Sequence, residues 1–159
     1  MLKFNWRAGA VVSAAVASAL FAAWGMGRVD LAVAAPQGGP ELIARSADGH
    51  FWAEAVVNGQ RVRTLIDTGA SVVALTREDA LRLGIELSPE DFDQWIGAAG
   101  GPARAARVQL DHVTVAGARI ERVEAMVIED GLPASLLGMS YLGRLSRIEA
   151  TPAGLTLSR

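Results

Sequence analysis

The chain has 159 residues, a formal net charge of −2 and no cysteine. A chain of this length corresponds to about one domain. Its mildly acidic, scattered charge excludes the basic surface of a nucleic-acid-binding protein. The lack of cysteine excludes disulfides, thiolate metal sites and a cysteine nucleophile.

The first 35 residues differ in composition from the rest. Lys3 and Arg7 precede an uncharged, mostly apolar run over residues 8–27, which at about 20 residues is long enough to cross a bilayer. Positive charge before the run predicts that the N-terminus stays inside and that the domain lies in the periplasm, tethered to inner-membrane lipid. A cleaved signal peptide is the alternative, since residues 32–34 form an Ala-x-Ala site and the domain would then be secreted. Both interpretations predict export, with residues 1–35 as the anchor or signal.

Residues 36–47 form a predicted linker that is rich in proline and glycine. From residue 48 to residue 159, short apolar stretches alternate with turn residues, which predicts an all-β domain with one or two short helices. Asn58-Gly59 predicts a type I′ hairpin turn, because both central positions of that turn need positive φ. Thr76 is the predicted cap of a short helix that ends at Gly84. The expected strands are 51–57, 60–66, 72–75, two arms within 94–106, 107–115, 119–128, 145–150 and 155–158.

The most informative feature is the tripeptide Asp67-Thr68-Gly69. It lies between the apolar pair Leu65-Ile66 and the β-forming run from Val72 to Leu75, although Asp and Gly are both depleted in strand interiors. A carboxylate between apolar strands is partly desolvated, and such carboxylates concentrate at functional sites. The alternative is a turn in which the Asp67 side chain only caps its own backbone.

The segment from Leu65 to Val73 resembles the active-site loop of the aspartic proteases, and above all that of the single-domain, retropepsin-like members. Two apolar residues precede Asp-Thr-Gly-Ala, and a polar residue and β-formers follow it. Leu136, Leu137 and Gly138 resemble the second family signature, an apolar-apolar-Gly tripeptide that opens a short helix and packs behind the catalytic loop. The resemblance covers residues 48–158 and implies a closed β-barrel like one half of an acid protease.

The resemblance also implies an endopeptidase mechanism. Aspartic proteases need two adjacent carboxylates that hold one proton between them, so that one acts as the base and the other as the acid. The sequence contains one Asp-Thr-Gly, so we expect a homodimer whose two-fold axis places Asp67 beside its mate. The alternative is a non-catalytic module of the same fold that binds peptides or serves only for dimerisation.

The resemblance assigns roles to the neighbours of Asp67. Thr68 is expected to bond across to the partner loop, and Gly69 to donate its N–H to Asp67. Ala70 stands where pepsin-like members often carry Ser, so the pair of carboxylates is expected to work at a milder pH. Ser71 is expected to make local hydrogen bonds.

The flap is the Gly-rich β-hairpin that covers the substrate in this family. Residues 96–103 are the candidate, with Gly97, Gly100 and Gly101 supplying backbone freedom; an ordinary surface loop is the alternative. Trp95 is expected to pack in the core, and the alternative is that it lines a substrate subsite. The apolar strand 155–157 is expected either to enter a dimer sheet or to form an edge of the monomer.

No cofactor or metal is expected. No His or acidic cluster has the spacing of metal ligands, and no Gly-rich loop joins a strand to a helix as a nucleotide site requires. His50 and His112 are far apart in the sequence and are expected at the surface.

Overall fold

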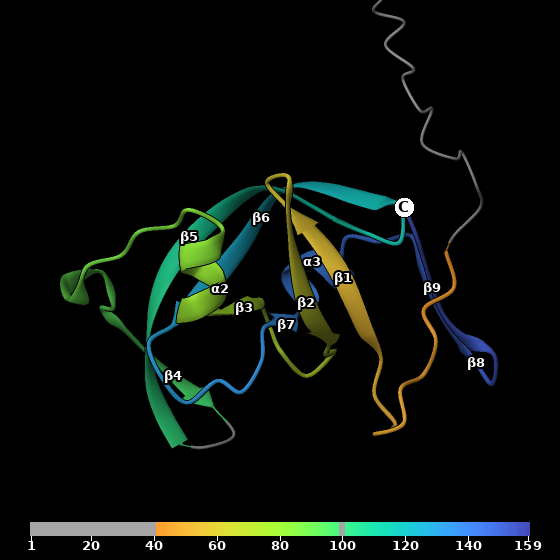
Figure 1. The fold of residues 1–159 in the computed structure, drawn as a ribbon, viewed down its shortest axis with the longest axis horizontal. Coiled ribbons are helices and arrows are strands. Elements are labelled where there is room, and N and C mark those ends of the chain that lie inside the picture. Colours follow the sequence, from red (N-terminus) through yellow and green to blue (C-terminus); the bar gives the residue numbers. More distant parts are fainter. Residues whose placement is uncertain (1–40, 99–100) are drawn as a thin grey trace, which may run out of the picture. The chain divides into compact units, whose positions relative to one another are not determined.

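The computed structural model describes residues 41–98 and 101–159 (Figure 1). The segment expected to be an anchor or signal, residues 1–35, lies outside the described residues, and so does Gly100 of the candidate flap. None of the helices in the described part combines the length and the apolarity needed to cross a bilayer. The elements in chain order are β1 (Trp52–Val57), β2 (Gln60–Ile66), β3 (Val73–Thr76), α2 (Arg77–Arg82), the 3-10 helix η1 (Pro89–Asp91), β4 (Gln94–Ala98), β5 (Gly101–Val115), β6 (Ala118–Ile128), β7 (Leu136–Leu137), α3 (Met139–Leu142), β8 (Arg147–Thr151) and β9 (Gly154–Ser158).

The main sheet closes on itself. Its strand order is β1-β2-β7-β3-β6-β5-β4, and β1 also pairs with β5, so that six strands form a barrel and β4 extends from its edge. A separate two-stranded sheet holds β8 and β9. The prediction of a mostly β domain with short helices is confirmed.

The turn between β1 and β2 has the predicted backbone conformation. Asn58 and Gly59 have φ of 48° and 87°, which confirms the predicted positive-φ turn between β1 and β2.

The expected break between residues 106 and 107 is wrong, because β5 runs unbroken from Gly101 to Val115. Its first part pairs with β4 and its remainder with β6, and Ala105 belongs to both ladders. Because β5 pairs with β4 along its first part and with β6 along the rest, its backbone stays hydrogen-bonded and no turn is needed between the two parts.

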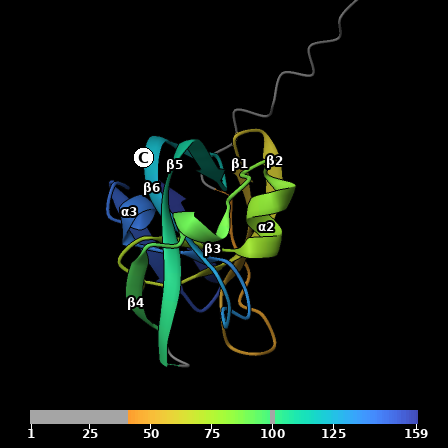
Figure 2. The same ribbon diagram turned by 90° about the vertical axis from the view of Figure 1, so that its left-hand side faces the viewer.

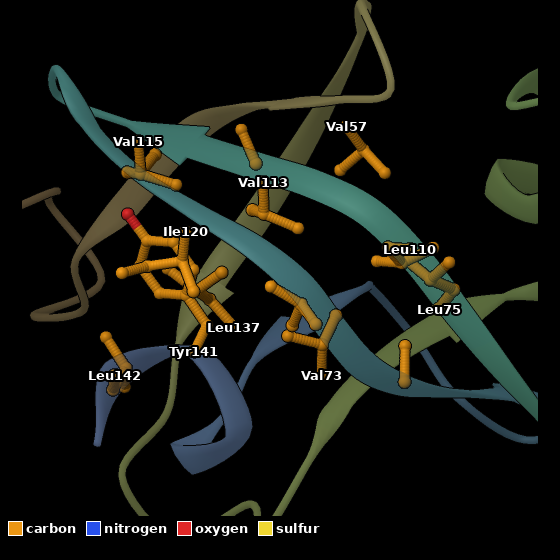
Figure 3. Close-up of a cluster of buried hydrophobic side chains, with 14 of the residues drawn as sticks. Val57, Val73, Leu75, Leu110, Val113, Val115, Ile120, Leu137, Tyr141 and Leu142 are labelled. Atoms are coloured by element: carbon orange, nitrogen blue, oxygen red, sulfur yellow. The ribbon is translucent and has the colours of Figure 1, made fainter. Parts of the chain in front are cut away.

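The core fills the barrel between β5, β6 and the segment that contains α3 (Figure 3). Tyr141 is fully buried, and its hydroxyl donates to the Ala118 carbonyl at 2.6 Å. Burial raises the pKa of Tyr141 to about 12, so the hydroxyl keeps its proton and the hydrogen bond. Ile43, which falls within the predicted linker, is buried and exchanges two backbone hydrogen bonds with Leu155.

The short strand β7 lies between β2 and β3, parallel to the first and antiparallel to the second. The chain therefore passes directly behind the turn that joins β2 to β3. Gly138 makes this passage possible, because a Cβ there would overlap the carbonyl oxygen of Val72 and lie 2.8 Å from that of Ala70. Both obstacles are backbone atoms, which no side-chain rotation can move away.

A buried carboxylate ties helix α2 to the residue that precedes β7. Asp79 accepts hydrogen bonds from the hydroxyls of Thr76 and Ser135 and forms an ion pair with Arg82. The Ser135 hydroxyl accepts the Thr76 N–H at 3.1 Å, and its carbonyl accepts the Leu65 N–H at 2.9 Å. Asp79 and Ser135 are both buried, so this network fixes the entry to β7 against β2, β3 and α2.

Replacing Gly138 by Ala is expected to lower the free energy of unfolding by at least about 3 kcal/mol, because overpacking against backbone forces two chain segments apart. Chemical denaturation of both proteins measures the change. Gly97→Ala is the matched control, since a Cβ there meets nothing within 4 Å. Equal stability of the two variants would contradict the close passage.

Replacing Asp79 by Ala is expected to lower the free energy of unfolding by about 3 kcal/mol, because the Ser135 hydroxyl and Arg82 lose a charged acceptor. Glu78→Ala is the control on the same helix. Glu78 also faces Arg82, at 3.6 Å, but its side chain is 83% exposed, so its loss should change stability by less than about 0.5 kcal/mol. Similar losses in both variants would show that the buried network does not hold α2.

Candidate active site

Asp67 begins a tight turn directly after β2. Its N–H donates to the Leu137 carbonyl at 3.1 Å, and its carbonyl accepts the Ala70 N–H at 3.3 Å. The carboxylate oxygen Oδ1 accepts the Gly69 N–H at 2.8 Å, which is the hydrogen bond expected from the sequence. Gly69 suits this position because a Cβ would lie 3.1 Å from the same oxygen. The turn thus aims one backbone donor at the Asp67 carboxylate.

Helix α3 holds the other end of the turn. The N–H groups of Met139 and Ser140 donate to the carbonyls of Ala70 and Ser71, at 2.8 and 3.0 Å. These donors are free because the first N–H groups of a helix have no partner within it. The expectation that Leu136, Leu137 and Gly138 pack behind the turn agrees with this arrangement.

Ser140 is a supporting residue that the sequence analysis missed. Its hydroxyl donates to the Glu124 carbonyl at 2.7 Å and accepts the Val73 N–H at 2.9 Å. It therefore joins α3 to both β6 and the start of β3. Its position two residues after Gly138 could have indicated a role near the turn. The sequence does not show, however, which strands its hydroxyl would bond to.

The turn opens outward from the barrel. Thr68, Gly69 and Ser71 are exposed, and Asp67 and Ala70 are half-buried. In the described part of the chain, no three His, Asp or Glu side chains gather in a way that would hold a metal ion. What the turn presents is a single carboxylate on a rigid base, with exposed neighbours available for contact with another molecule.

A small apolar cluster adjoins the turn. Leu136 lies at its edge, paired in register with Leu65 and Ala74. The buried members are Ala74, Ala105 and Ile128, and the partly buried side chains around them are Ile96, Ala103, Met126, Leu132 and Leu136. Through Leu136, the cluster lies next to β2, the strand that ends at the Asp67 turn.

Residues expected to form the flap belong to the projecting β4–β5 hairpin. β4 pairs with β5 from Gln94 opposite Ala105 to Ala98 opposite Gly101, and it extends beyond the barrel (Figures 1 and 2). Ile96 and Ala103 face the apolar cluster. The expected core position of Trp95 is wrong: its side chain is 72% exposed, because it alternates with Ile96 and so points to the opposite face.

A hollow of about 530 Å³ lies elsewhere, between α2 and residues 128–135. Its lining includes Trp52, Arg63 and Asp79 and does not include Asp67.

The chain is similar in sequence to a known protein family and to two curated proteins. Residues 53–144, more than half of the chain, match the family described as "gag-polyprotein putative aspartyl protease". An uncharacterised protein of Rickettsia prowazekii is 41% identical over 106 residues, which cover 67% of this chain and 46% of that protein. An uncharacterised protein of a Sinorhizobium species is 36% identical over 109 residues, 68% of this chain and 47% of that protein. The chain thus spans about half the length of these curated relatives.

Solved structures show the same fold. A retropepsin-like aspartic protease from Rickettsia conorii has a TM-score of 0.67 and 37% identity, over 75% of this chain and 89% of that chain. EIAV protease, in complex with an inhibitor, has a TM-score of 0.52 and 21% identity, over 64% of this chain and 92% of its own, and this likeness shows the fold alone. The matched region contains the Asp67 turn, the β7 support and the barrel strands, and on this basis the chain belongs to the retropepsin-like aspartic protease family.

Proposed function

We propose that this chain is an aspartic endopeptidase whose active site forms across a homodimer. The observation that carries the proposal is the Asp67 turn. It is fixed from behind by β7 and α3 and leaves one half-buried carboxylate on an exposed loop. One such carboxylate cannot act as acid and base at the same time, and a two-fold axis beside the turn supplies the second.

The reaction follows from two carboxylates that share one proton. The ionised Asp67 takes a proton from a water molecule as the water oxygen attacks the carbonyl carbon of the peptide bond. The protonated Asp67 of the partner subunit donates to the carbonyl oxygen. The Asp67 that took the water proton then gives it to the amide nitrogen, and the partner's Asp67 takes a proton back from a hydroxyl of the tetrahedral intermediate. The C–N bond breaks, which releases an amine and a carboxylic acid and restores the shared proton. The Gly69 N–H holds its carboxylate in place during these transfers, at 2.8 Å from Oδ1.

An extended polypeptide suits the surface beside the turn. The β4–β5 hairpin offers backbone groups to a strand lying beneath it, in the manner of β-strand addition. Ile96 from the hairpin and Leu132 and Leu136 from the segment that leads into β7 are partly buried and pack in one apolar cluster. The substrate side chains next to the cleaved bond are therefore proposed to be apolar.

The location of the enzyme is part of the proposal and rests on the sequence pattern of residues 1–35. With these residues as an uncleaved anchor and residues 36–47 as a linker, the domain of residues 48–159 would work in the periplasm beside the inner membrane. Signal cleavage would instead release a secreted enzyme. Fractionation of cells that express the tagged full chain distinguishes a membrane-bound product from a soluble, shortened one.

Replacing Asp67 by Asn should abolish proteolysis while leaving the fold and the dimer intact. The test follows cleavage of an unfolded protein by the full chain in mild detergent, from about pH 3 to about pH 8. Activity should fall by roughly a thousandfold or more, the scale seen when a group acting in the transition state is removed. Asp111→Asn is the control, since Asp111 is exposed on β5, and it should keep full activity.

Dilution gives an independent reading of the same proposal. Activity of the unaltered chain should fall faster than linearly as it is diluted, because dissociation separates the two carboxylates. A site shared by two copies would be contradicted if activity stayed proportional to chain concentration even where the chain is monomeric. Equal activity of the Asp67→Asn variant would contradict it too. A folded dimer that binds peptides and cleaves none would favour the peptide-binding alternative.

The variant Ala70→Ser should shift the acidic limb of the pH–activity profile to lower pH. A hydroxyl at this position, next to the turn, favours the ionised form of a neighbouring carboxylate, so the working protonation state persists in more acidic solution. The pH profile of kcat/KM measures the shift, and Ser71→Ala serves as the control on the same loop. An unchanged or more alkaline limb would show that residue 70 does not influence the carboxylates.

A further inference from the structure

The hollow beside α2 has the composition of a second binding site. It lies between α2 and residues 128–135, which join β6 to β7 (Figure 1), and Asp67 is not part of its lining. The lining combines apolar side chains, among them Leu132 and Pro133, with the guanidinium groups of Arg63 and Arg77. Its volume of about 530 Å³ is within the range of small-molecule sites. Apolar surface beside positive charge suits an organic anion.

Aromatic rings hold the two arginines in place. The guanidinium carbon of Arg63 lies 4.6 Å from the centre of the Trp52 ring, and that of Arg77 lies 5.3 Å from the centre of the Phe92 ring. The Trp52 ring is itself fixed, because its indole N–H donates to Asp48 at 2.9 Å. A guanidinium stacked on a ring keeps the N–H groups at its edge available, in the planar fork that matches a carboxylate.

Three of the four acidic side chains of the lining are paired with arginine. Asp79 forms an ion pair with Arg82, and Glu78 lies 3.6 Å from the same guanidinium. Glu129 pairs with Arg104 at 3.5 Å. Within residues 41–98 and 101–159, the two stacked arginines form no ion pair of their own. Their positive charge is therefore available to a ligand.

The wall of the hollow offers free backbone groups. Residues 130–134 belong to no helix or strand, and within the described part of the chain they make no backbone–backbone hydrogen bond. Asp130, the fourth acidic residue of the lining, accepts the Gly131 N–H at 2.8 Å. The other N–H and C=O groups of this wall can bond to the backbone of a peptide. This favours a peptide over an organic acid that has no amide groups.

We propose that this hollow binds the carboxyl terminus of a peptide whose last residue is apolar. The terminal carboxylate bonds to the guanidinium edges of Arg63 and Arg77. The last side chain contacts Leu132 and Pro133, and the peptide backbone runs along residues 130–134. The site is separate from the Asp67 turn, and the inference does not rest on the proposed protease activity.

The same wall leads into the support of the Asp67 turn. The Ser135 carbonyl accepts the Leu65 N–H at 2.9 Å, and Leu132 packs in the apolar cluster that includes Ile96 of the β4–β5 hairpin. A peptide bound in the hollow therefore contacts the segment that enters β7 and is linked through it to the Asp67 turn.

A chemical-shift titration tests the site. The probe is N-acetyl-leucine, which has one carboxylate and one apolar side chain, added to the isotope-labelled full chain in detergent. The indole N–H signal of Trp52 should shift to saturation, because the carboxylate binds to the guanidinium stacked on that ring. Trp95 is outside the lining and 72% exposed on β4, so its indole signal is the internal control. A shift at Trp95 with none at Trp52 would overturn the site.

Removal of single charges tests the two arginines. Arg63→Gln and Arg77→Gln should each raise the dissociation constant of the probe about tenfold, because each removes charge-assisted hydrogen bonds to the carboxylate. Arg61→Gln is the matched control, since Arg61 is exposed on the same strand as Arg63 and is not part of the lining. Equal weakening in all three variants would reduce the effect to net charge and contradict the proposed contacts.

Two further probes identify the ligand class. N-acetyl-leucine amide keeps the apolar side chain and lacks the charge, and isocaproate keeps the charge and the apolar chain and lacks the amide group. Both should bind more weakly than N-acetyl-leucine. Equal binding of the amide would show that the arginines do not recognise the carboxylate. Tighter binding of isocaproate would assign the hollow to a free carboxylic acid and overturn the peptide terminus.

The titration separates this inference from the proposed function, because it needs no proteolysis. The Asp67→Asn variant should bind the probe as tightly as the unaltered chain does. Loss of binding in this variant would place the probe at the Asp67 turn and overturn the second site, while leaving the protease proposal in place. Binding that depends on Arg63 and Arg77 in a chain without proteolysis would support the second site and contradict the protease proposal.

Discussion

The insertion of Leu136-Leu137-Gly138 between β2 and β3 is the constraint on which the rest of the structure depends. It closes the barrel and supplies the Leu137 carbonyl to the Asp67 N–H. It also directs the first N–H groups of α3 toward the carbonyls of Ala70 and Ser71. The backbone passes so close to Val72 that only glycine fits at position 138. One short segment therefore determines both the sheet order and the orientation of the half-buried Asp67 carboxylate.

Two carboxylates of this domain, Asp79 and Asp67, differ in burial and in hydrogen bonding, and this difference supports a structural role for the first and the proposed catalytic role for the second. Asp79 is buried, but its carboxylate accepts hydrogen bonds from two hydroxyls and pairs with Arg82. These contacts hold α2 to the residue that precedes β7. Asp67 is half-buried, accepts one hydrogen bond from Gly69 within the described residues, and lies among exposed residues. A carboxylate with unused acceptor capacity on a rigid loop can take part in proton transfer, whereas a saturated one cannot do so without breaking its network.

The sequence revealed those features that depend on neighbouring residues. Asn58-Gly59 specified its turn through positive φ, and Thr76 capped α2 because its hydroxyl accepts the Asp79 N–H three residues on. Features that depend on distant pairing were not accessible. The unbroken β5 follows from its change of partners, and the roles of Ser135 and Ser140 arise from contacts 56 and 67 residues away. Trp95 was placed in the core by its hydrophobicity, but the edge position of β4 leaves one face of that strand uncovered.

The single Asp67 carboxylate of each chain makes the proposed peptide hydrolysis depend on dimerisation. In the proposed dimer each copy contributes one carboxylate, one apolar cluster and one hairpin, so neither the acid–base pair nor the substrate groove would exist before two copies meet. The population of such a dimer would depend on the local concentration of the chain. Confinement of both copies to a membrane surface would raise that concentration, so the proposed anchor would favour the proposed dimer.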